Sequence, residues 1–138
     1  MPNWNDATIT EFHAKAGKGV GPFGDHLILL TTVGVRSGKE RTTPVVYHRD
    51  GEGYVVIASK SGAPDNPAWY NNLKANPQAR VEVGTATGTD TFEVRAREVE
   101  GKERERMYAE RVAFAPGFGE YPRMTSRQIP VMVLERIG

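Results

Sequence analysis

The sequence predicts an α+β fold in which six short strands form a mostly antiparallel sheet, closed into a small barrel with about three flanking helices. Three observations support this prediction. Apolar residues cluster or alternate in six short segments. Turn residues join most of these segments directly, which favours antiparallel pairing. Helical spacing is confined to three segments, and such a sheet with helices outside it closes most economically into a barrel.

The first helix is expected close to the N-terminus. The segment from Thr8 to Glu11 resembles a capping box, in which Thr8 is the N-cap and Glu11 bonds back to it. Apolar and aromatic residues follow at helical spacing, and Gly17 ends the helix. Residues 17–24 contain four glycines and one proline, so we expect a flexible connection that could carry this helix over a ligand.

The first hairpin is expected over residues 27–49. Residues 27–33 are rich in branched apolar side chains, which indicates a strand with both faces covered. Residues 42–49 form the returning strand, in which Pro44 cannot donate to the ladder and so belongs at an edge or beside a ligand. The loop over residues 34–41 is longer than a tight hairpin requires, and such loops often carry function.

The remaining elements follow in order. A turn at residues 50–53 leads into a third strand over 54–59. Asn66 as N-cap and Pro67 as first helical residue predict a second helix that runs to about residue 75. Strands are expected over 79–83 and 89–99, the latter with one solvated face. A charged amphipathic helix over 101–114, an aromatic loop over 115–123 and a strand over 129–135 complete the chain.

Composition limits the function. The 138 residues suit one domain, with residues 1–24 as its N-terminal helix and connection. A formal net charge of +1 provides no global attraction to nucleic acid, so anion recognition must be local. The absence of cysteine excludes disulfides, thiol catalysis and cysteine-ligated metals, and it suits a cytoplasmic protein. No apolar run is long enough to span a membrane, and Met1 to Asp6 shows no secretory signal.

The sequence does not favour metal or hydrolytic chemistry. The three histidines are scattered without acidic partners at ligand spacing, so we interpret them as structural or surface residues and predict no metal site. The serines lack a nearby histidine–carboxylate pair, and Gly-x-Ser-x-Gly is absent, which disfavours nucleophilic hydrolysis.

The loop over residues 34–41 is the strongest candidate for binding. Arg36, Lys39 and Arg41 lie within six residues, and Gly34 and Gly38 permit unusual backbone angles. Two guanidinium groups and an ammonium can hold a phosphate or carboxylate. The alternative interpretation is a solvated hairpin tip.

Two further features bear on this site. Lys60 follows the third strand at the start of the next loop, and the helix that begins near Asn66 offers free N–H groups that attract anions. Trp69, in the first turn of that helix, either contacts a ligand or packs in the core. Phe118 and Tyr121 belong to a loop that either covers an apolar pocket or packs on the end of the barrel.

Two stretches carry a family resemblance. LLTTVGVRSGKERTTP at residues 29–44 and ASKSGAPDNPAWYNNLKANP at residues 58–77 resemble the deazaflavin-dependent nitroreductase family, and TSRQIP at residues 125–130 is more weakly similar. The resemblance implies a split β-barrel like those of flavin-nucleotide oxidoreductases. It also implies the 8-hydroxy-5-deazaflavin coenzyme F(420), whose tail carries a phosphate and oligoglutamate, and hydride transfer from its reduced form to a planar hydrophobic acceptor such as a quinone or nitroaromatic.

The resemblance also implies site residues. The cofactor contacts would be Arg36, Ser37, Arg41, Thr42, Thr43, Pro44, Val46, Ala58, Ser59, Lys60, Ala68, Trp69, Tyr70, Asn71 and Asn72. The acceptor contacts would be Phe118 and Tyr121, and either a backbone amide or Ser59 could stabilise charge during catalysis. Two alternatives remain open at this point, namely a non-catalytic deazaflavin storage protein and an FMN-binding split-barrel oxidoreductase. A homodimer, and peripheral association with a membrane if the acceptor is a membrane quinone, are compatible with the resemblance.

Overall fold

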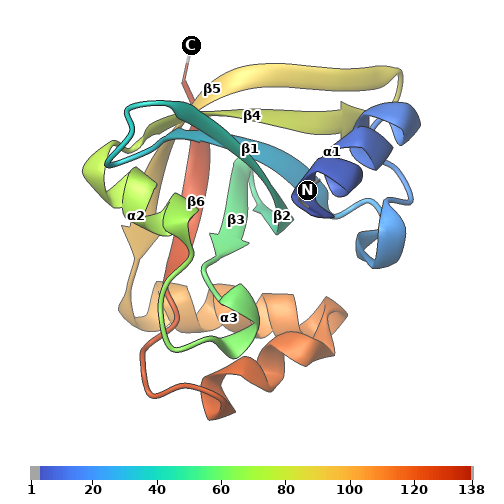
Figure 1. Ribbon diagram of the computed structural model, residues 1–138. Helices are drawn as coiled ribbons and strands as arrows, with labels where there is room; N and C mark the ends of the chain where they lie inside the picture. The colour runs from blue at the N-terminus through green and yellow to red at the C-terminus, as the bar shows by residue number, and fades with distance from the viewer. Residues whose placement is uncertain (1–3, 138) are drawn as a thin grey trace.

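The structure is a computed structural model that describes residues 4–137, and its centre is a closed six-stranded barrel (Figure 1). The strands are β1 (Leu27–Val33), β2 (Glu40–Asp50), β3 (Gly53–Ile57), β4 (Gln78–Thr85), β5 (Gly88–Val99) and β6 (Val131–Arg136). They close in the order β1-β2-β3-β6-β5-β4, and every neighbouring pair is antiparallel. The predicted barrel is therefore confirmed.

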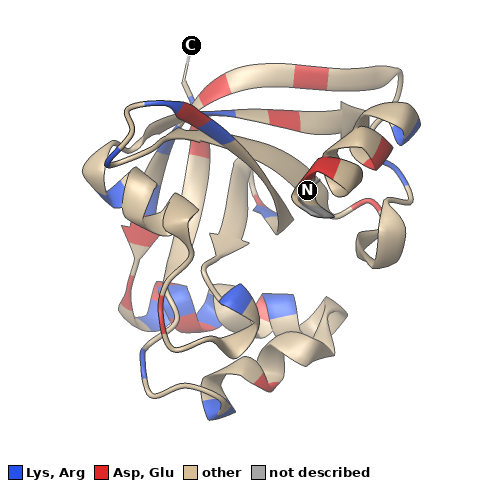
Figure 2. Ribbon diagram, viewed as in Figure 1, with Lys and Arg blue, Asp and Glu red and all other residues tan. Residues whose placement is uncertain are grey.

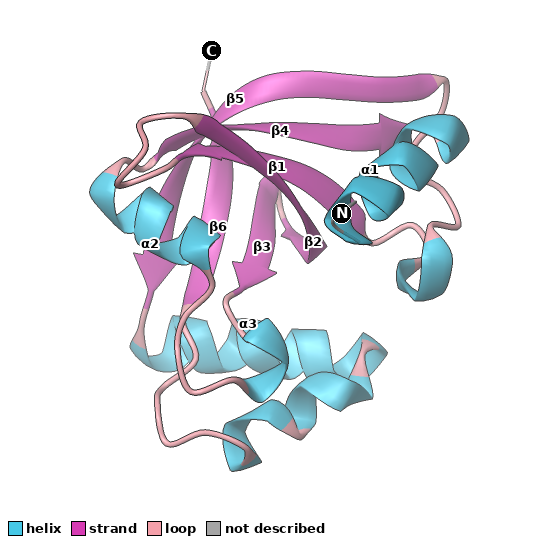
Figure 3. Cartoon of the chain, in the orientation of Figure 1, coloured by secondary structure: helices cyan, strands magenta, loops and turns pink. Residues whose placement is uncertain are grey.

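Three α-helices pack around the barrel (Figure 3). They are α1 (Trp4–Lys15), α2 (Ala68–Ala75) and α3 (Gly101–Phe114). Short 3-10 helices lie in the connections at η1 (Gly21–Phe23), η2 (Lys60–Gly62), η3 (Pro116–Gly119) and η4 (Tyr121–Arg123). Among the described residues, no helix is long and apolar enough to cross a membrane.

Each helix covers a different apolar surface. Trp69 and Leu73 of α2 belong to the main core cluster, which β1, β4, β5 and β6 also line. Met107 and Tyr108 of α3 pack on a second cluster formed by β3 and β6. Phe12 of α1 is fully buried against the start of β1. As predicted, β5 has one solvated face, because buried and exposed side chains alternate along its centre.

The predicted capping box in the first helix is wrong. The helix already includes Trp4, so Thr8 lies within it. The Glu11 carboxylate accepts from Lys15 Nζ at 2.7 Å and from the Gly21 N–H at 2.9 Å. The glycine-rich connection is more structured than predicted, since Val20 is buried and forms an isolated bridge with Gly24. Residues 1–3 of the stretch assessed for a secretory signal lie outside the described residues.

Several predicted boundaries also differ; for example, β3 ends at Ile57 rather than at residue 59. The strand β2 begins at Glu40, so the preceding loop is shorter than predicted and Arg41 lies in the strand. The predicted five-residue turn between the fourth and fifth strands is a tight hairpin, in which Thr85 pairs with Gly88. Pro67 is the N-cap of α2, and among residues 4–137 no side chain caps that helix, so the predicted capping role of Asn66 is wrong.

The two glycines of the β1–β2 loop have different roles. Gly38 has φ +67°, a backbone conformation that favours glycine. The φ of Gly34 is not positive, but a Cβ there would lie 2.6 Å from Ser37 Oγ. The sequence therefore predicts the conformational role of Gly38 correctly, whereas Gly34 is needed for space.

Candidate functional site

A cleft of about 930 Å³ lies between the β1–β2 loop, the start of β2, α1 and α2. Its volume lies within the range of small-molecule and cofactor sites. Asn5, Asp6 and Ile9 of α1 contribute to its wall, so the N-terminal helix does border a cavity. Nine of the predicted cofactor contacts line this cleft, namely Arg36, Ser37, Arg41, Thr42, Thr43, Ala68, Trp69, Asn71 and Asn72.

Two cations of the cleft are not engaged by acidic side chains. Arg36 lies in the β1–β2 loop and Arg41 on β2, and both are exposed. In the part of the chain that the structure describes, neither forms an ion pair. Figure 2 shows that the β1–β2 hairpin carries several basic segments. Both guanidinium groups can therefore bind an anion without first breaking a salt bridge.

The start of α2 forms another part of the wall. Ala68 and Trp69 line the cleft, and the absence of a side-chain cap leaves the first N–H groups of this helix without a side-chain acceptor. Such groups favour an anionic ligand. Trp69 is only 7% exposed and belongs to the main core, so the core-packing role considered from the sequence is confirmed, whereas its contact with a ligand stays a prediction.

The side chain of Asn72 connects α2 to the β1–β2 hairpin. Its Nδ2 donates to Thr32 Oγ1 at 2.9 Å, and its Oδ1 accepts from the Val35 N–H at 3.2 Å. Asn72 and Thr32 are both buried. Because Val35 directly precedes Arg36, this bridge positions the backbone from which one of the two cleft guanidinium groups extends.

The predicted cation Lys60 lies apart from the cleft lining. Its Nζ donates to Asp65 Oδ2 at 3.0 Å, within the β3–α2 loop. The pKa of the Asp65 carboxyl is lowered, mainly by this hydrogen bond and then by the charge of Lys60. Lys60 and the following Ser61 have positive φ values of 46° and 54°. Such strained non-glycine residues persist where the surroundings hold them, often at functional sites.

Arg127 provides that support, and sequence reasoning did not identify it. Its guanidinium donates to the carbonyls of Ala58, Ser59 and Ala63 at 3.1, 2.8 and 3.0 Å, and to Asn66 Oδ1 at 2.7 Å. The group therefore holds both ends of the strained loop. The only available signal was its place in the TSRQIP stretch, which is weakly similar to the family.

The other predicted cofactor contacts lie outside the cleft lining. Pro44 is paired with Leu29 of β1 but lies beyond the segment of β2 that pairs with β3, which agrees with the predicted edge position. Tyr70 donates its hydroxyl to Glu98 at 2.8 Å. Burial and then this hydrogen bond raise the pKa of Tyr70 to about 12. The residues of the predicted set that do not line the cleft are Pro44, Val46, Ala58, Ser59, Lys60 and Tyr70.

The two predicted acceptor contacts pack on the second core cluster. Phe118 and Tyr121 form an edge-to-face pair with ring centroids 5.1 Å apart. The Tyr108 hydroxyl donates to the Phe118 carbonyl at 2.7 Å, which ties their loop to α3. Neither residue lines the cleft, so their contact with an acceptor stays a prediction.

A buried polar pair also escaped sequence reasoning. Arg111 of α3 is fully buried, and its Nε donates to His48 Nδ1 of β2 at 3.0 Å. Burial, followed by the charge of Arg111, lowers the pKa of His48 to about 4. Burial also lowers the pKa of Arg111 to about 9. The pair lies between α3 and the barrel, and no metal-binding group of three or more acidic or histidine residues occurs within residues 4–137.

Comparisons of sequence and of structure with known proteins give consistent matches. A family model described as F(420)H2-dependent quinone reductase matches residues 4–136. An F(420)H2-dependent quinone reductase of Mycobacterium tuberculosis is 38% identical over 112 residues, covering 79% of this chain and 72% of the relative. A solved F(420)-H2-dependent reductase (FDR-A) is 39% identical with a TM-score of 0.70, covering 80% of this chain and 94% of that chain. A solved structure described as a domain-swapped dimer is 35% identical with a TM-score of 0.73, covering 94% of this chain and 95% of that chain.

Proposed function

This chain belongs to the F(420)H2-dependent quinone reductase family, and from that premise we propose that the cleft between the β1–β2 hairpin, α1 and α2 holds the cofactor. The protein is an oxidoreductase, and its cofactor is coenzyme F(420). The observation that carries the proposal is the joint exposure of Arg36 and Arg41, neither of them ion-paired within residues 4–137, in one cleft of suitable size.

The chemistry of the cleft fits this cofactor. The tail of F(420) is a polyanion, and the cleft offers two guanidinium groups together with the uncapped start of α2. Its ring system is planar with polar edges, and Ile9, Ala68 and Trp69 supply apolar surface in the same cleft against which the face of the ring can pack. The proposal therefore places the tail near the arginines and the ring toward the apolar wall.

The bound cofactor supplies the hydride, which reduces a quinone to the hydroquinone together with one proton. The protein contributes binding and orientation, which dominate catalysis when the cofactor carries the reaction. Asn72 positions the loop of Arg36, while Arg127 holds the loop that contains Ser59 and Lys60. We assign the proton to solvent, because no histidine is among the described residues that line the cleft and the Tyr70 hydroxyl is directed at Glu98.

The acceptor class follows from the family, whereas finer features of the function are proposals. We propose a planar hydrophobic quinone as acceptor, with nitroaromatics as further substrates and Phe118 and Tyr121 as contacts on the acceptor side. The relative with 35% identity supports a proposal that two copies of this chain form a dimer. Exposed Val33 and Val35 beside the cations of the hairpin support a peripheral contact with a membrane that contains the quinone.

The test has two stages. The protein is first mixed with oxidised F(420), and the spectrum of the desalted sample is recorded with FMN as a parallel ligand. Retention of deazaflavin, with an affinity that falls steeply with salt, is expected. Reduced F(420) is then mixed with a panel of quinones, and the return of the deazaflavin absorbance is followed. If F(420) binds tightly but the deazaflavin absorbance does not return with any quinone, the proposed reaction is contradicted.

A further inference from the structure

Glu40 places a negative charge beside the proposed site of a polyanion. It is the first residue of β2, and it lines the cleft together with Arg36 and Arg41. It also lines a second, smaller pocket of about 220 Å³, which lies between the ends of β1, β2 and β4. A free carboxylate at this position would repel phosphate and glutamate groups.

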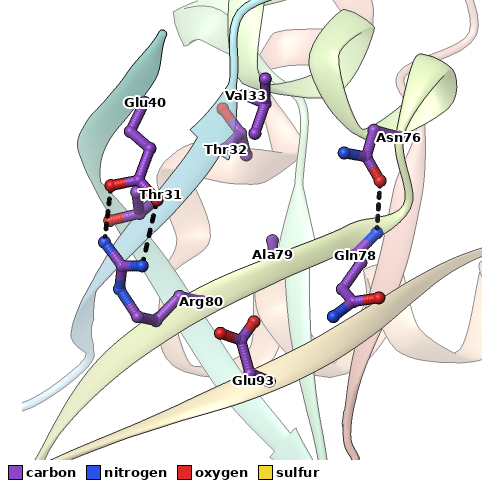
Figure 4. A pocket seen from close by; sticks show the side chains of 9 residues that line it. All are labelled: Thr31, Thr32, Val33, Glu40, Asn76, Gln78, Ala79, Arg80 and Glu93. Atoms are coloured by element: carbon purple, nitrogen blue, oxygen red, sulfur yellow. Dashed lines mark hydrogen bonds and ion pairs between the residues drawn. The ribbon is translucent and has the colours of Figure 1, made fainter. Parts of the chain in front are cut away.

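Arg80 neutralises this carboxylate from outside the cleft. The side chain extends from β4 past β1, so that Nη1 and Nη2 donate to Glu40 Oε2 and Oε1 at 3.1 and 3.0 Å (Figure 4). The strand register explains how the Arg80 side chain reaches Glu40. Thr31 of β1 pairs with Arg80 of β4 on one side and with Thr42 of β2 on the other, so only β1 separates β4 from β2 here. This two-point geometry is the strong form of an arginine–carboxylate pair.

The charges of the cleft give this pair its importance. The charged residues of the lining are Asp6, Arg36, Glu40 and Arg41, so its formal charges cancel. Arg80 is not part of the lining, yet its charge opposes that of Glu40 directly. The pKa of the Glu40 carboxyl is lowered, mainly by the hydrogen bonds from Arg80 and then by its charge, which agrees with the two-point contact between the two side chains. With Arg80 counted, the charge of the cleft region is net positive.

We propose that Arg80 is a specificity-determining residue, which makes the cleft selective for cofactor molecules with highly charged tails by neutralising Glu40. The inference rests on the proposed function of the cleft. Exposed ion pairs contribute little to stability, so a purely structural role would leave binding unchanged or would weaken it equally for every ligand. An electrostatic role must instead scale with the charge of the tail and decline with salt.

The experiment compares ligands of different charge. Affinities are measured for F(420) molecules with long and short oligoglutamate tails and for the tail-free 8-hydroxy-5-deazaflavin alcohol. Arg80→Met should weaken binding of the long-tailed form about three- to tenfold at low ionic strength and leave the tail-free form unchanged. Glu40→Gln should strengthen binding of the long-tailed form, and the double variant should bind it at least as well as the wild type.

A matched control is Arg136→Met. It removes an exposed arginine that is 3.5 Å from Asp90 and lies outside the cleft lining, so tail dependence should not change. Thermal unfolding of each variant verifies that it is folded. Equal changes for tailed and tail-free ligands would overturn the role of Arg80 while leaving the cleft as the cofactor site. Failure of the wild-type protein to bind any of the deazaflavins would instead overturn the proposed function.

Discussion

Arg127 Nη1 donates to Asn66 Oδ1 at 2.7 Å, so the side chain that the sequence assigns to a helix cap serves the β3–α2 loop instead. The start of α2 thereby keeps its N–H groups free of a side-chain cap. The same guanidinium holds three carbonyls of the loop that contains Lys60 and Ser61. One arginine distant in sequence thus shapes the loop and leaves the helix start open.

Replacing Arg127 by lysine should disturb this loop. An ammonium group cannot reproduce the planar fork that contacts four oxygens, so buried carbonyls lose their donors. We expect a loss of unfolding free energy of about 1–3 kcal/mol and cofactor affinity that is lower by about tenfold. Urea unfolding and deazaflavin titration measure the two effects. Arg123→Lys is the control, because that arginine is exposed and its ion pair with Glu120 is loose at 3.7 Å. Equal losses of stability and affinity in both variants would refute the role of Arg127 in holding the loop.

The cations should contribute unequally to cofactor binding. Arg41→Ala or Arg36→Ala should weaken binding by about 1–3 kcal/mol while leaving stability unchanged. Lys60→Ala should have a smaller effect, because Asp65 already holds its ammonium group outside the cleft lining. Titration with F(420) at two salt concentrations measures the difference, with Lys39→Ala as a control from the same loop. A loss for Lys60 equal to that for Arg41 would show that Lys60 moves to the ligand.

The bridge formed by Asn72 can be tested from the side that does not line the cleft. Thr32→Val removes the acceptor of the Asn72 amide while preserving the shape of the side chain. Since Asn72 then loses one of its two anchors, we expect cofactor affinity to fall by about threefold to tenfold and unfolding free energy to fall by about 1–2 kcal/mol. Thr89→Val is the control, because its hydroxyl donates to Glu82 Oε2 at 2.9 Å and neither residue lines the cleft. Undiminished affinity in Thr32→Val would mean that the bridge is not needed for binding.

His48 should make the protein sensitive to acid. Burial and the charge of Arg111 lower its pKa in the folded state to about 4, whereas an unfolded chain has the ordinary value near 6.5. Between these values the unfolded state binds more protons than the folded state. Its contribution to stability is therefore fully present above about pH 6.5 and is lost as pH falls through about 4.

The variant His48→Asn isolates this effect. The amide oxygen can still accept from Arg111 Nε, but the group no longer titrates. We expect the wild type to lose roughly 1–3 kcal/mol more unfolding free energy than the variant between pH 7 and pH 4.5. Urea unfolding at both pH values measures the loss of unfolding free energy in each protein. The carboxylates are the same in both, so their contribution cancels in the difference. Parallel loss in the two proteins would exclude His48 as the source.

Much of the molecule was predictable because its signals are local. The alternation of Phe92, Val94 and Ala96 with charged residues identified a half-solvated strand, and the helix over 101–114 was predicted with its observed bounds. The cationic loop was also recognisable, since its arginines and glycines are close in sequence. The cap at Thr8 failed because residues before it already continue the helix, which a four-residue motif does not report.

Residue composition and periodicity alone thus determined the barrel, its helices and the hairpin that carries Arg36 and Arg41. Only the tertiary structure decided which cations lie together, that Arg80 neutralises Glu40, and that Arg127 and Asn72 position the two loops. These contacts join residues 40 or more positions apart, or different elements of the barrel. Periodicity records which face of a segment is buried, whereas the partner of a polar side chain depends on where the closed sheet places distant strands.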